Sequence, residues 1–263
     1  MKGTIRINPT LASILTRYRL DTLERIMGTP GDRVMREVPG RITVEVRLPN
    51  GLVLYLKRHS RPSAHPATAG LNEWDNIEAL NTLGISCPVL VAAGSGTSNG
   101  APCSFLITVA VPEAIPLDDF LRRLYHDRDE ITRCRTKRGL ISKLAELAAR
   151  LHRHGFHHKD FYLCHVFVNR HMPLAAPLTL IDLQRLGRVR FFRRRWVVKD
   201  LAALNYSATP EFTTATDRLR FLMSYLGITR LTPTARRLIR SVQGKTERIR
   251  RHDRKLQGLC PTG

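Results

Sequence analysis

Acidic residues are scarce in this sequence. Its 263 residues include 22 Asp and Glu against 43 Lys and Arg, which gives a formal net charge of +21. An excess of this size predicts an anionic partner. Charge alone leaves three candidates open: nucleic acid, an acidic membrane surface and a phosphorylated substrate.

Long apolar runs and paired cysteines are also missing. No stretch approaches the roughly 20 uninterrupted apolar residues of a membrane span, and the first residues, MKGTIRINP, lack the apolar core of a secretion signal. The cysteines are odd in number and none forms a Cys-x-x-Cys pair, which argues against a disulfide framework. They are Cys87, Cys103, Cys134, Cys164 and Cys260. We expect a cytoplasmic protein with reduced thiols.

Aromatic residues make up only 6% of the chain. Proteins that bind single-stranded nucleic acid stack bases on aromatic side chains, and no such platform or recognition motif is visible. Specific nucleic-acid binding is therefore not predicted. The hydrophobic fraction of 43% is nevertheless sufficient for a packed core.

The order of the predicted elements indicates an α+β fold with two lobes. Residues 41–48 and 52–57 predict a β-hairpin, because two β-rich runs flank the turn Pro-Asn-Gly. An apolar stripe predicts a helix over 69–83, and 104–111 predicts a buried strand. From about residue 111 helices dominate, so we expect a β-rich lobe over 1–110 and a helical lobe over 111–263.

Two further local predictions follow from turn and cap residues. A short helix is predicted over 21–27, with Asp21 as its N-cap and Gly28 at its end. The glycines at 94, 96 and 100 predict a surface loop, since no helix follows them as it would in a phosphate-binding loop.

Four elements along the chain carry residues typical of phosphoryl transfer. Lys57 ends the second hairpin strand in YLKRH, and Glu73 lies on the following helix. Asp160 lies in the string HKDFYLCH, and Asp182 in LIDLQR. Taken singly each is weak, but the ordered set with matching element types is a strong signal.

This pattern resembles the protein-kinase-like superfamily, in which a strand lysine, a helix glutamate, a His-Arg-Asp loop and a metal-binding aspartate occur in this order. It is most similar to the heptose kinase branch of the bacterial lipopolysaccharide core kinases. The strings YLKRH, HKDFYLCH, LIDLQR and WVVKDLAAL carry the resemblance, which covers about residues 34–207.

The resemblance implies a bilobal kinase-like fold, with nucleotide binding in the first lobe and catalysis and acceptor binding in the second. ATP and Mg²⁺ are the implied cofactors. Lys57 would hold the nucleotide phosphates, and Glu73 would fix Lys57 by an ion pair. Asp182 would bind Mg²⁺. Asp160 would receive or orient the acceptor's proton, while His158 belongs to the catalytic set as a support for its loop.

Two departures from the pattern concern His165 and Arg41. His165 occupies the position of the metal-binding Asn and is the second predicted metal ligand, although imidazole suits Mg²⁺ less well than an amide oxygen. The nucleotide loop is reduced to residues 38–41, without Gly-x-Gly-x-x-Gly, so Arg41 is expected to compensate for missing backbone contacts. A zinc site in the histidine cluster at 152–165 is not predicted, because no carboxylate ligand accompanies it.

The acceptor is expected to be polyanionic. Between Asp182 and Asp200 the segment has no acidic residue and no Ala-Pro-Glu, which disfavours peptide docking, and its arginines can pair with phosphate or carboxylate. They include Arg185, Arg188, Arg190, Arg193, Arg194 and Arg195. The resemblance implies the lipopolysaccharide inner core, built at the cytoplasmic face of the inner membrane.

The basic run 229–255 lies on the anionic membrane surface in one interpretation and forms a solvated terminal helix in the other. The alternative to a peripheral membrane kinase is a non-catalytic pseudokinase that binds anionic glycolipid or the membrane.

Overall fold

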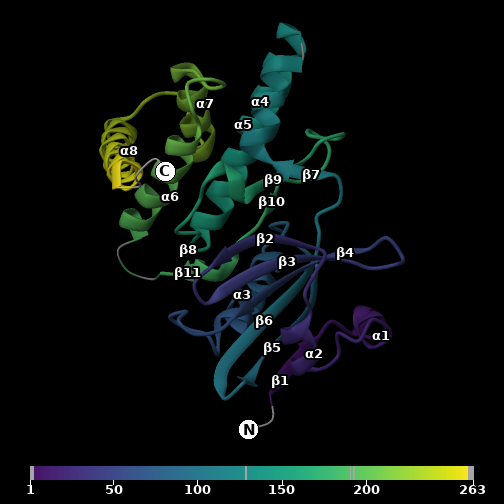
Figure 1. Ribbon diagram of the computed structural model, residues 1–263. Coiled ribbons are helices and arrows are strands. Elements are labelled where there is room, and N and C mark those ends of the chain that lie inside the picture. Colours follow the sequence, from purple (N-terminus) through teal and green to yellow (C-terminus); the bar gives the residue numbers. More distant parts are fainter. Residues whose placement is uncertain (1–2, 128, 190, 192, 260–263) are drawn as a thin grey trace. The chain divides into compact units, whose positions relative to one another are not determined.

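The computed structural model describes residues 3–127, 129–189, 191 and 193–259 (Figure 1). The chain divides into two compact units. The first runs to Pro112 and also takes in Asp182–Gln184, and the second contains Glu113–Ile181 and the chain from Arg185 onward. The inclusion of Asp182–Gln184 in the first unit was not foreseen from the sequence.

The first unit is built on a six-stranded antiparallel sheet with the order β1-β5-β6-β4-β3-β2. The strands are β1 (Thr4–Ile7), β2 (Arg33–Val38), β3 (Arg41–Arg47), β4 (Val53–His59), β5 (Leu90–Ser98) and β6 (Ala101–Val109). The predicted hairpin is confirmed as β3 and β4, because Thr43 pairs with Lys57 in an antiparallel register.

Helices cover this sheet and complete its core. They are η1 (Pro9–Leu11), α1 (Ala12–Arg17), α2 (Leu23–Gly28) and α3 (Ala69–Asn81). The predicted stripe on α3 buries Trp74, Ile77 and Leu80, and this helix packs against β5 and β6. Burying each such side chain contributes about 1.5–3 kcal/mol, so α3 is fixed firmly to the strands that carry its neighbours.

Two local predictions in this unit were wrong. Thr22, not Asp21, is the N-cap of α2: its hydroxyl accepts the N–H of Arg25, and Asp21 instead forms an ion pair with the Arg25 side chain. Gly94 lies in β5 rather than in a surface loop, paired with Ile5 of β1 and with β6. A Cβ at Gly94 would lie 2.7 Å from the Thr4 carbonyl oxygen, so glycine there permits close strand approach.

The second unit is mainly helical, as expected. Its helices are α4 (Leu117–Asp127), α5 (Glu130–Arg153), α6 (Arg193–Ser207), α7 (Ala215–Leu226) and α8 (Pro233–Leu259). Short strands form two small sheets, β10-β9-β7 and β11-β8. They are β7 (Ala114–Pro116), β8 (Phe156–His157), β9 (Val166–Asn169), β10 (Thr179–Leu180) and β11 (Gly187–Arg188), with 3-10 turns η2 (Leu163–His165) and η3 (Leu183–Arg185).

The sequence defines the ends of these helices clearly. Asp129 caps α5 by accepting the N–H of Thr132, and Gly155, with φ +80°, follows its last turn. Thr214 and Asp217 form a reciprocal capping box at the start of α7. None of the helices among the described residues has both the length and the apolar character that a bilayer crossing requires.

Candidate active site

In the first unit, three of the predicted residues come together. The Nζ of Lys57, on β4, lies 2.6 Å from Oε1 of Glu73 on α3 and 3.4 Å from Oδ1 of Asp182. The Lys57 side chain is 19% exposed and Glu73 only 2%. The strand lysine, the helix glutamate and the downstream aspartate therefore form one partly buried charge cluster.

Burial alone would lower the pKa of Lys57, but the carboxylates of Glu73 and Asp182 outweigh it and raise the pKa above its ordinary value. The lysine is thus held as a cation at the point where a strongly anionic ligand would approach. A lone buried ammonium would lose its proton or be excluded, so the paired carboxylates are what allow it to remain charged in this place.

The segment that carries Asp182 is also held in the first unit by hydrogen bonds of its backbone. The N–H of Leu183 donates to Oε1 of Glu73 at 3.2 Å, and the side-chain amide of Asn76 donates to the Leu183 carbonyl oxygen at 2.8 Å. Asp182 itself has φ +56°, in the left-handed region that non-glycine residues rarely adopt. Such conformations cost about 1–3 kcal/mol and cluster at functional sites.

Arg41 begins β3, directly after the two-residue turn Pro39-Gly40. Its guanidinium donates to Oε1 of Gln184 at 2.8 Å, so it lies near the same segment as Asp182. Residues 38–41, the short segment that the sequence offers in place of a nucleotide loop, form the β2–β3 connection. Gly40, with φ +75°, closes it, and its carbonyl oxygen accepts the N–H of Ser60.

In the second unit, Asp160 is held by an arginine. Both carboxylate oxygens of Asp160 lie 2.9 Å from NH1 of Arg185. The carboxylate is 25% exposed and the Arg185 side chain 62% exposed, so this pair is open to solvent and can be separated at little cost. Lys159, the residue before Asp160, has φ +69°. Like Asp182, it is a non-glycine residue in the left-handed region.

The two histidines of the HKDFYLCH string brace the loop around Asp160. His165 lies with Nδ1 2.7 Å from the Asp160 carbonyl oxygen, so Nδ1 donates this hydrogen bond. His158 is fully buried, and its Nε2 donates to the Ile181 carbonyl oxygen at 3.0 Å. The His158 ring stacks on Phe161 and on His165. This geometry supports the predicted role of His158 as a loop support.

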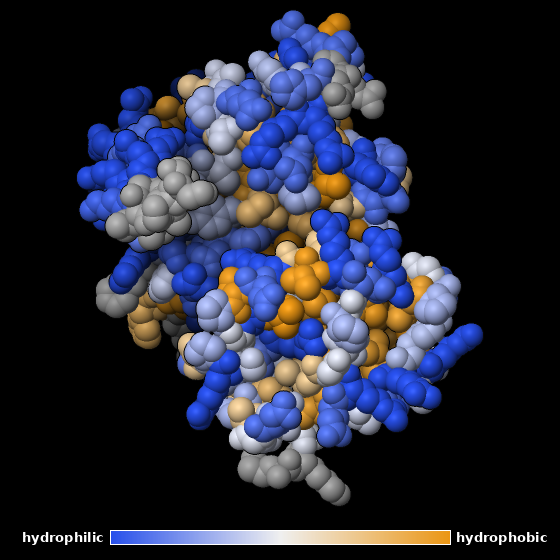
Figure 2. Space-filling model, viewed as in Figure 1, coloured by the Kyte–Doolittle hydropathy of each residue, from blue (hydrophilic) through white to orange (hydrophobic). Residues whose placement is uncertain are grey.

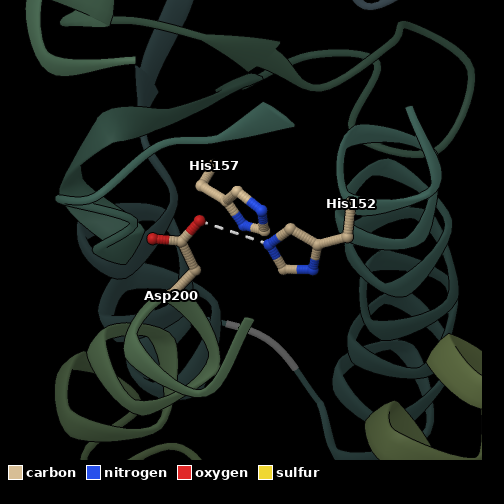
Figure 3. Close-up of side chains that lie close together, drawn as sticks. All are labelled: His152, His157 and Asp200. Carbon is tan, nitrogen blue, oxygen red and sulfur yellow. Dashed lines mark hydrogen bonds and ion pairs between the residues drawn. The ribbon is translucent and has the colours of Figure 1, made fainter. Parts of the chain in front are cut away.

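A buried aspartate on α6 anchors the same loop. Asp200 is 0% exposed, and its two oxygens accept the backbone N–H groups of His158 and Lys159, each at 2.8 Å. His152 of α5 adds a third contact, with Nε2 3.2 Å from Asp200 (Figure 3) and Nδ1 2.9 Å from the Tyr225 hydroxyl. The carboxylate therefore fixes the peptide groups that lead into Asp160.

His157 completes this cluster, and its two ring nitrogens have no hydrogen-bond partner among the described residues. Its ring stacks on that of His152 at 5.3 Å between centroids, and burial lowers its pKa to about 4. His152, His157 and Asp200 bring possible metal-binding atoms within 4.8 Å of one another. The argument against a zinc site, that no carboxylate accompanies the histidines, was therefore wrong. The Asp200 carboxylate nevertheless accepts two backbone hydrogen bonds, so it supports the loop.

Sequence reasoning missed the roles of Asp200, Arg185 and Gln184. Asp200 is followed by the apolar run LAAL inside a helix, and an acidic residue beside such a run is the signal that could have indicated a buried functional carboxylate. Arg185 was grouped with other basic residues, and its contact with Asp160 arises only because η3 brings the two together. Arg190, in the same basic segment, lies outside the described residues.

A strand lysine paired with a helix glutamate, an aspartate beside them, and a His-x-Asp loop braced from a buried helix aspartate define a protein-kinase-like phosphotransferase. Comparison with known protein families assigns the chain to one family within this class. The model of the lipopolysaccharide kinase (Kdo/WaaP) family matches residues 56–225. The chain belongs to this family.

Curated relatives cover most of the chain. The lipopolysaccharide core heptose(I) kinase WaaP of Pseudomonas aeruginosa is 30% identical over 220 residues, which are 78% of this chain and 80% of the relative. WaaP of Escherichia coli K12 is 27% identical over 82% of this chain and 87% of the relative. A solved structure, WaaP in complex with acyl carrier protein, is 26% identical with a TM-score of 0.70 and covers 96% of this chain and 99% of that one.

Proposed function

We propose that this chain transfers the terminal phosphate of ATP to a heptose hydroxyl of the lipopolysaccharide core. The observation that carries the proposal is the Lys57–Glu73–Asp182 cluster, found in a member of a lipopolysaccharide kinase family. Phosphoryl transfer requires mainly positioned phosphates, neutralised charge and an oriented hydroxyl, and the chain offers one group for each task.

Each of these groups has a defined role in the proposed reaction. Lys57 holds the nucleotide phosphates, and Glu73 keeps its ammonium in place. Asp160 accepts the proton of the heptose hydroxyl while its oxygen attacks the terminal phosphorus and ADP departs. For the hydroxyl to reach Asp160, the Arg185 guanidinium has to move aside or share the carboxylate, which their exposed pairing allows.

The residues present fit a divalent metal. Asp182 offers the hard carboxylate oxygens that Mg²⁺ prefers, and its left-handed backbone fixes the direction of the side chain. When bound, Mg²⁺ would neutralise charge on the nucleotide phosphates. His165 is the second candidate ligand, through Nε2 of the neutral ring, since Nδ1 donates to the Asp160 carbonyl oxygen.

The test is transfer of labelled phosphate from ATP to deacylated lipopolysaccharide core. We expect transfer by the intact chain and its loss in Asp160→Ala and in Asp182→Ala, with the acceptor gaining the mass of one phosphate. Transfer that persists in both variants would show that the roles are assigned to the wrong residues. Mg-ATP should also raise the Tm of the intact chain by mass action. The relatives are named as kinases, which does not favour a pseudokinase.

Location at the anionic face of the inner membrane is part of the proposal. The surface over α8 is strongly hydrophilic (Figure 2). Two of its apolar residues, Ile239 and Val242, line a cavity within the second unit, so they contribute to packing in the unit itself. Electrostatic attachment through the basic face, rather than apolar insertion, is therefore the mode we propose. Sedimentation with vesicles containing phosphatidylglycerol, at low and high salt, tests it.

An acyl carrier protein is a further proposed partner, because the solved relative was determined in complex with one. The second unit contains an apolar cavity of about 270 Å³, lined by Leu121, Leu144 and Leu204 among others. A fatty acyl chain has the chemistry that such a lining accepts. Co-purification with acylated carrier protein, reduced by Leu144→Arg, is the expected result, and equal recovery of both variants would contradict it.

A further inference from the structure

The second unit contains a basic pocket whose lining residues have no role in the reaction proposed above. Its volume is about 630 Å³, and it lies between α6 and α8, which pack side by side (Figure 1). The residues that matter here are Arg195, Trp196 and Lys199 of α6 and Ser241, Lys245 and Arg248 of α8. We call this the α6–α8 pocket.

Helical spacing brings these side chains to the pocket. Arg195 and Lys199 are four residues apart and share one face of α6. Ser241, Lys245 and Arg248 follow one another at four and three residues on α8, again on one face. With Arg194, five cations on two facing helices line the pocket. They repel one another, so their arrangement destabilises the empty pocket unless a ligand supplies negative charge.

No carboxylate lines the α6–α8 pocket. Glu247 of α8 pairs instead with Arg250 and Arg254, and Asp253 is hydrogen-bonded to the Tyr206 hydroxyl. Among the residues that the structure describes, no acidic side chain lies within ion-pair distance of the five pocket cations. Burial lowers the pKa of Lys199, and the positive charges of Arg185 and Lys245 lower it further, while Asp160 and Asp200 act in the opposite direction without reversing the shift.

The start of α6 adds to this positive potential. Arg194 and Arg195 lie in the first turn of a 15-residue helix whose first turn contains no acidic residue. The helix dipole favours anions at this end, and cations there are normally unfavourable. Arginines at such a position, in a pocket without acids, make a strong site for phosphate or carboxylate oxygens.

Trp196 connects the pocket with the catalytic loop inside the same unit. Its ring lies 5.2 Å from the Nζ of Lys159, the neighbour of Asp160, and 5.6 Å from the Nζ of Lys199. Lys199 in turn lies close enough to Asp160 for the carboxylate to act on its titration. An acceptor held in the pocket would thus be held within reach of the loop that orients its hydroxyl.

We propose that the α6–α8 pocket binds phosphate groups already present on the acceptor, so that the substrate is a saccharide that is phosphorylated before this chain acts on it. The proposal rests on the proposed function. A volume of this size, within the usual range for small-molecule sites, suits a discrete sugar phosphate better than a flat bilayer. A preceding kinase-type reaction must therefore supply this substrate.

The test compares two probes: deacylated core oligosaccharide that retains its phosphates, and the same material treated with phosphatase. We expect Lys245→Ala and Arg248→Ala to raise the KM for the phosphorylated probe about 10-fold or more each, since each removes a charge-assisted contact, while kcat changes little. The matched control is Arg240→Ala, which removes an exposed cation of the same helix outside the pocket, and it should leave the KM unchanged.

Calorimetric binding without nucleotide separates the pocket from the chemistry. The intact chain should bind the phosphorylated probe more tightly than the treated one, and Lys245→Ala should abolish the difference. Equal binding of both probes by the intact chain would overturn the proposal while leaving the kinase function intact. So would a KM loss in Arg240→Ala equal to that in Lys245→Ala, since it would indicate general charge attraction. The proposal would also be overturned if Lys245→Ala weakened binding only to phosphatidylglycerol vesicles or to RNA. Such a result would indicate a membrane or nucleic-acid site.

Discussion

Replacing Asp200 by asparagine should destabilise the second unit severely. The carboxylate is fully buried and accepts two backbone N–H groups, those of His158 and Lys159, as well as a contact from His152. Asparagine keeps one acceptor oxygen and places an NH2 group against a backbone N–H. The loss of one charged hydrogen bond, about 1.5–3 kcal/mol, adds to an unsatisfied buried donor, about 1–3 kcal/mol. We expect a total loss of about 3–5 kcal/mol in the free energy of unfolding.

The consequence for activity should be equally clear. The two peptide groups that lose their anchor lead directly into Asp160, and a displacement of the order of 1 Å at a reacting group costs about 10²-fold in rate. Asp200→Asn should therefore lower kcat about 100-fold even where the protein remains folded. The KM for ATP should change less, because Lys57 and Glu73 belong to the other unit.

The assay is urea unfolding followed by tryptophan fluorescence. The two tryptophans lie one in each unit, so in a Trp74→Phe background Trp196 reports the second unit. Glu146→Gln is the control: Glu146 is 64% exposed and pairs only with Arg150 among the described residues, so its loss should cost less than about 0.5 kcal/mol. A loss below about 1 kcal/mol in Asp200→Asn, with unchanged kcat, would refute the anchoring role.

Three further predictions concern the charge cluster, acid stability and metal content. Lys57→Met should reduce kcat/KM more than Glu73→Gln, because the glutamine can still accept hydrogen bonds from Lys57 and Leu183. A larger loss of kcat/KM in Glu73→Gln would contradict this order. His59 and His157 are buried, with pKa values of about 4 against an ordinary 6.5, so the unfolded chain binds more protons than the folded chain between these pH values. The free energy of unfolding should therefore be full above pH 6.5 and fall as the pH drops towards 4, by up to about 3 kcal/mol per histidine. A series of Tm measurements at different pH checks this. Dialysis against a chelator should leave the Tm of the nucleotide-free protein unchanged if the cluster around His157 is a loop support, and a large drop would indicate a structural metal.

Local patterns allowed much of the first unit to be predicted. The β3–β4 hairpin and α3 follow from turn residues and apolar periodicity. The pairing of Lys57 with Glu73 was expected only from the resemblance to the kinases. Strands β1 and β2 were not predicted for physical reasons. β1 has only four residues, TIRI, which is too short a run for its alternation to identify a strand. The sequence of β2, RVMREV, does not alternate, and all of its residues are exposed.

The missed parts of the candidate site depend on tertiary contacts. Asp200 gains its role because α6 passes beside the backbone of residues 158 and 159, about 40 positions earlier in the chain. Gly94 looks like a loop residue in the sequence, and only its pairing with β1 shows that a strand requires it. Nothing local encodes either contact, so propensity and spacing could not have predicted them.

The membership of Asp182–Gln184 in the first unit has a consequence for synthesis. Residues 1–112 leave the ribosome before Asp182–Gln184, the three residues that supply a peptide N–H to Glu73 and a carboxylate to Lys57. About 70 further residues must be synthesised before these three are present. A nascent first unit would therefore hold its buried glutamate incompletely satisfied, and should reach full stability only late in translation. Fragments that stop at residue 112 are for this reason poor substitutes for the whole chain in nucleotide-binding work.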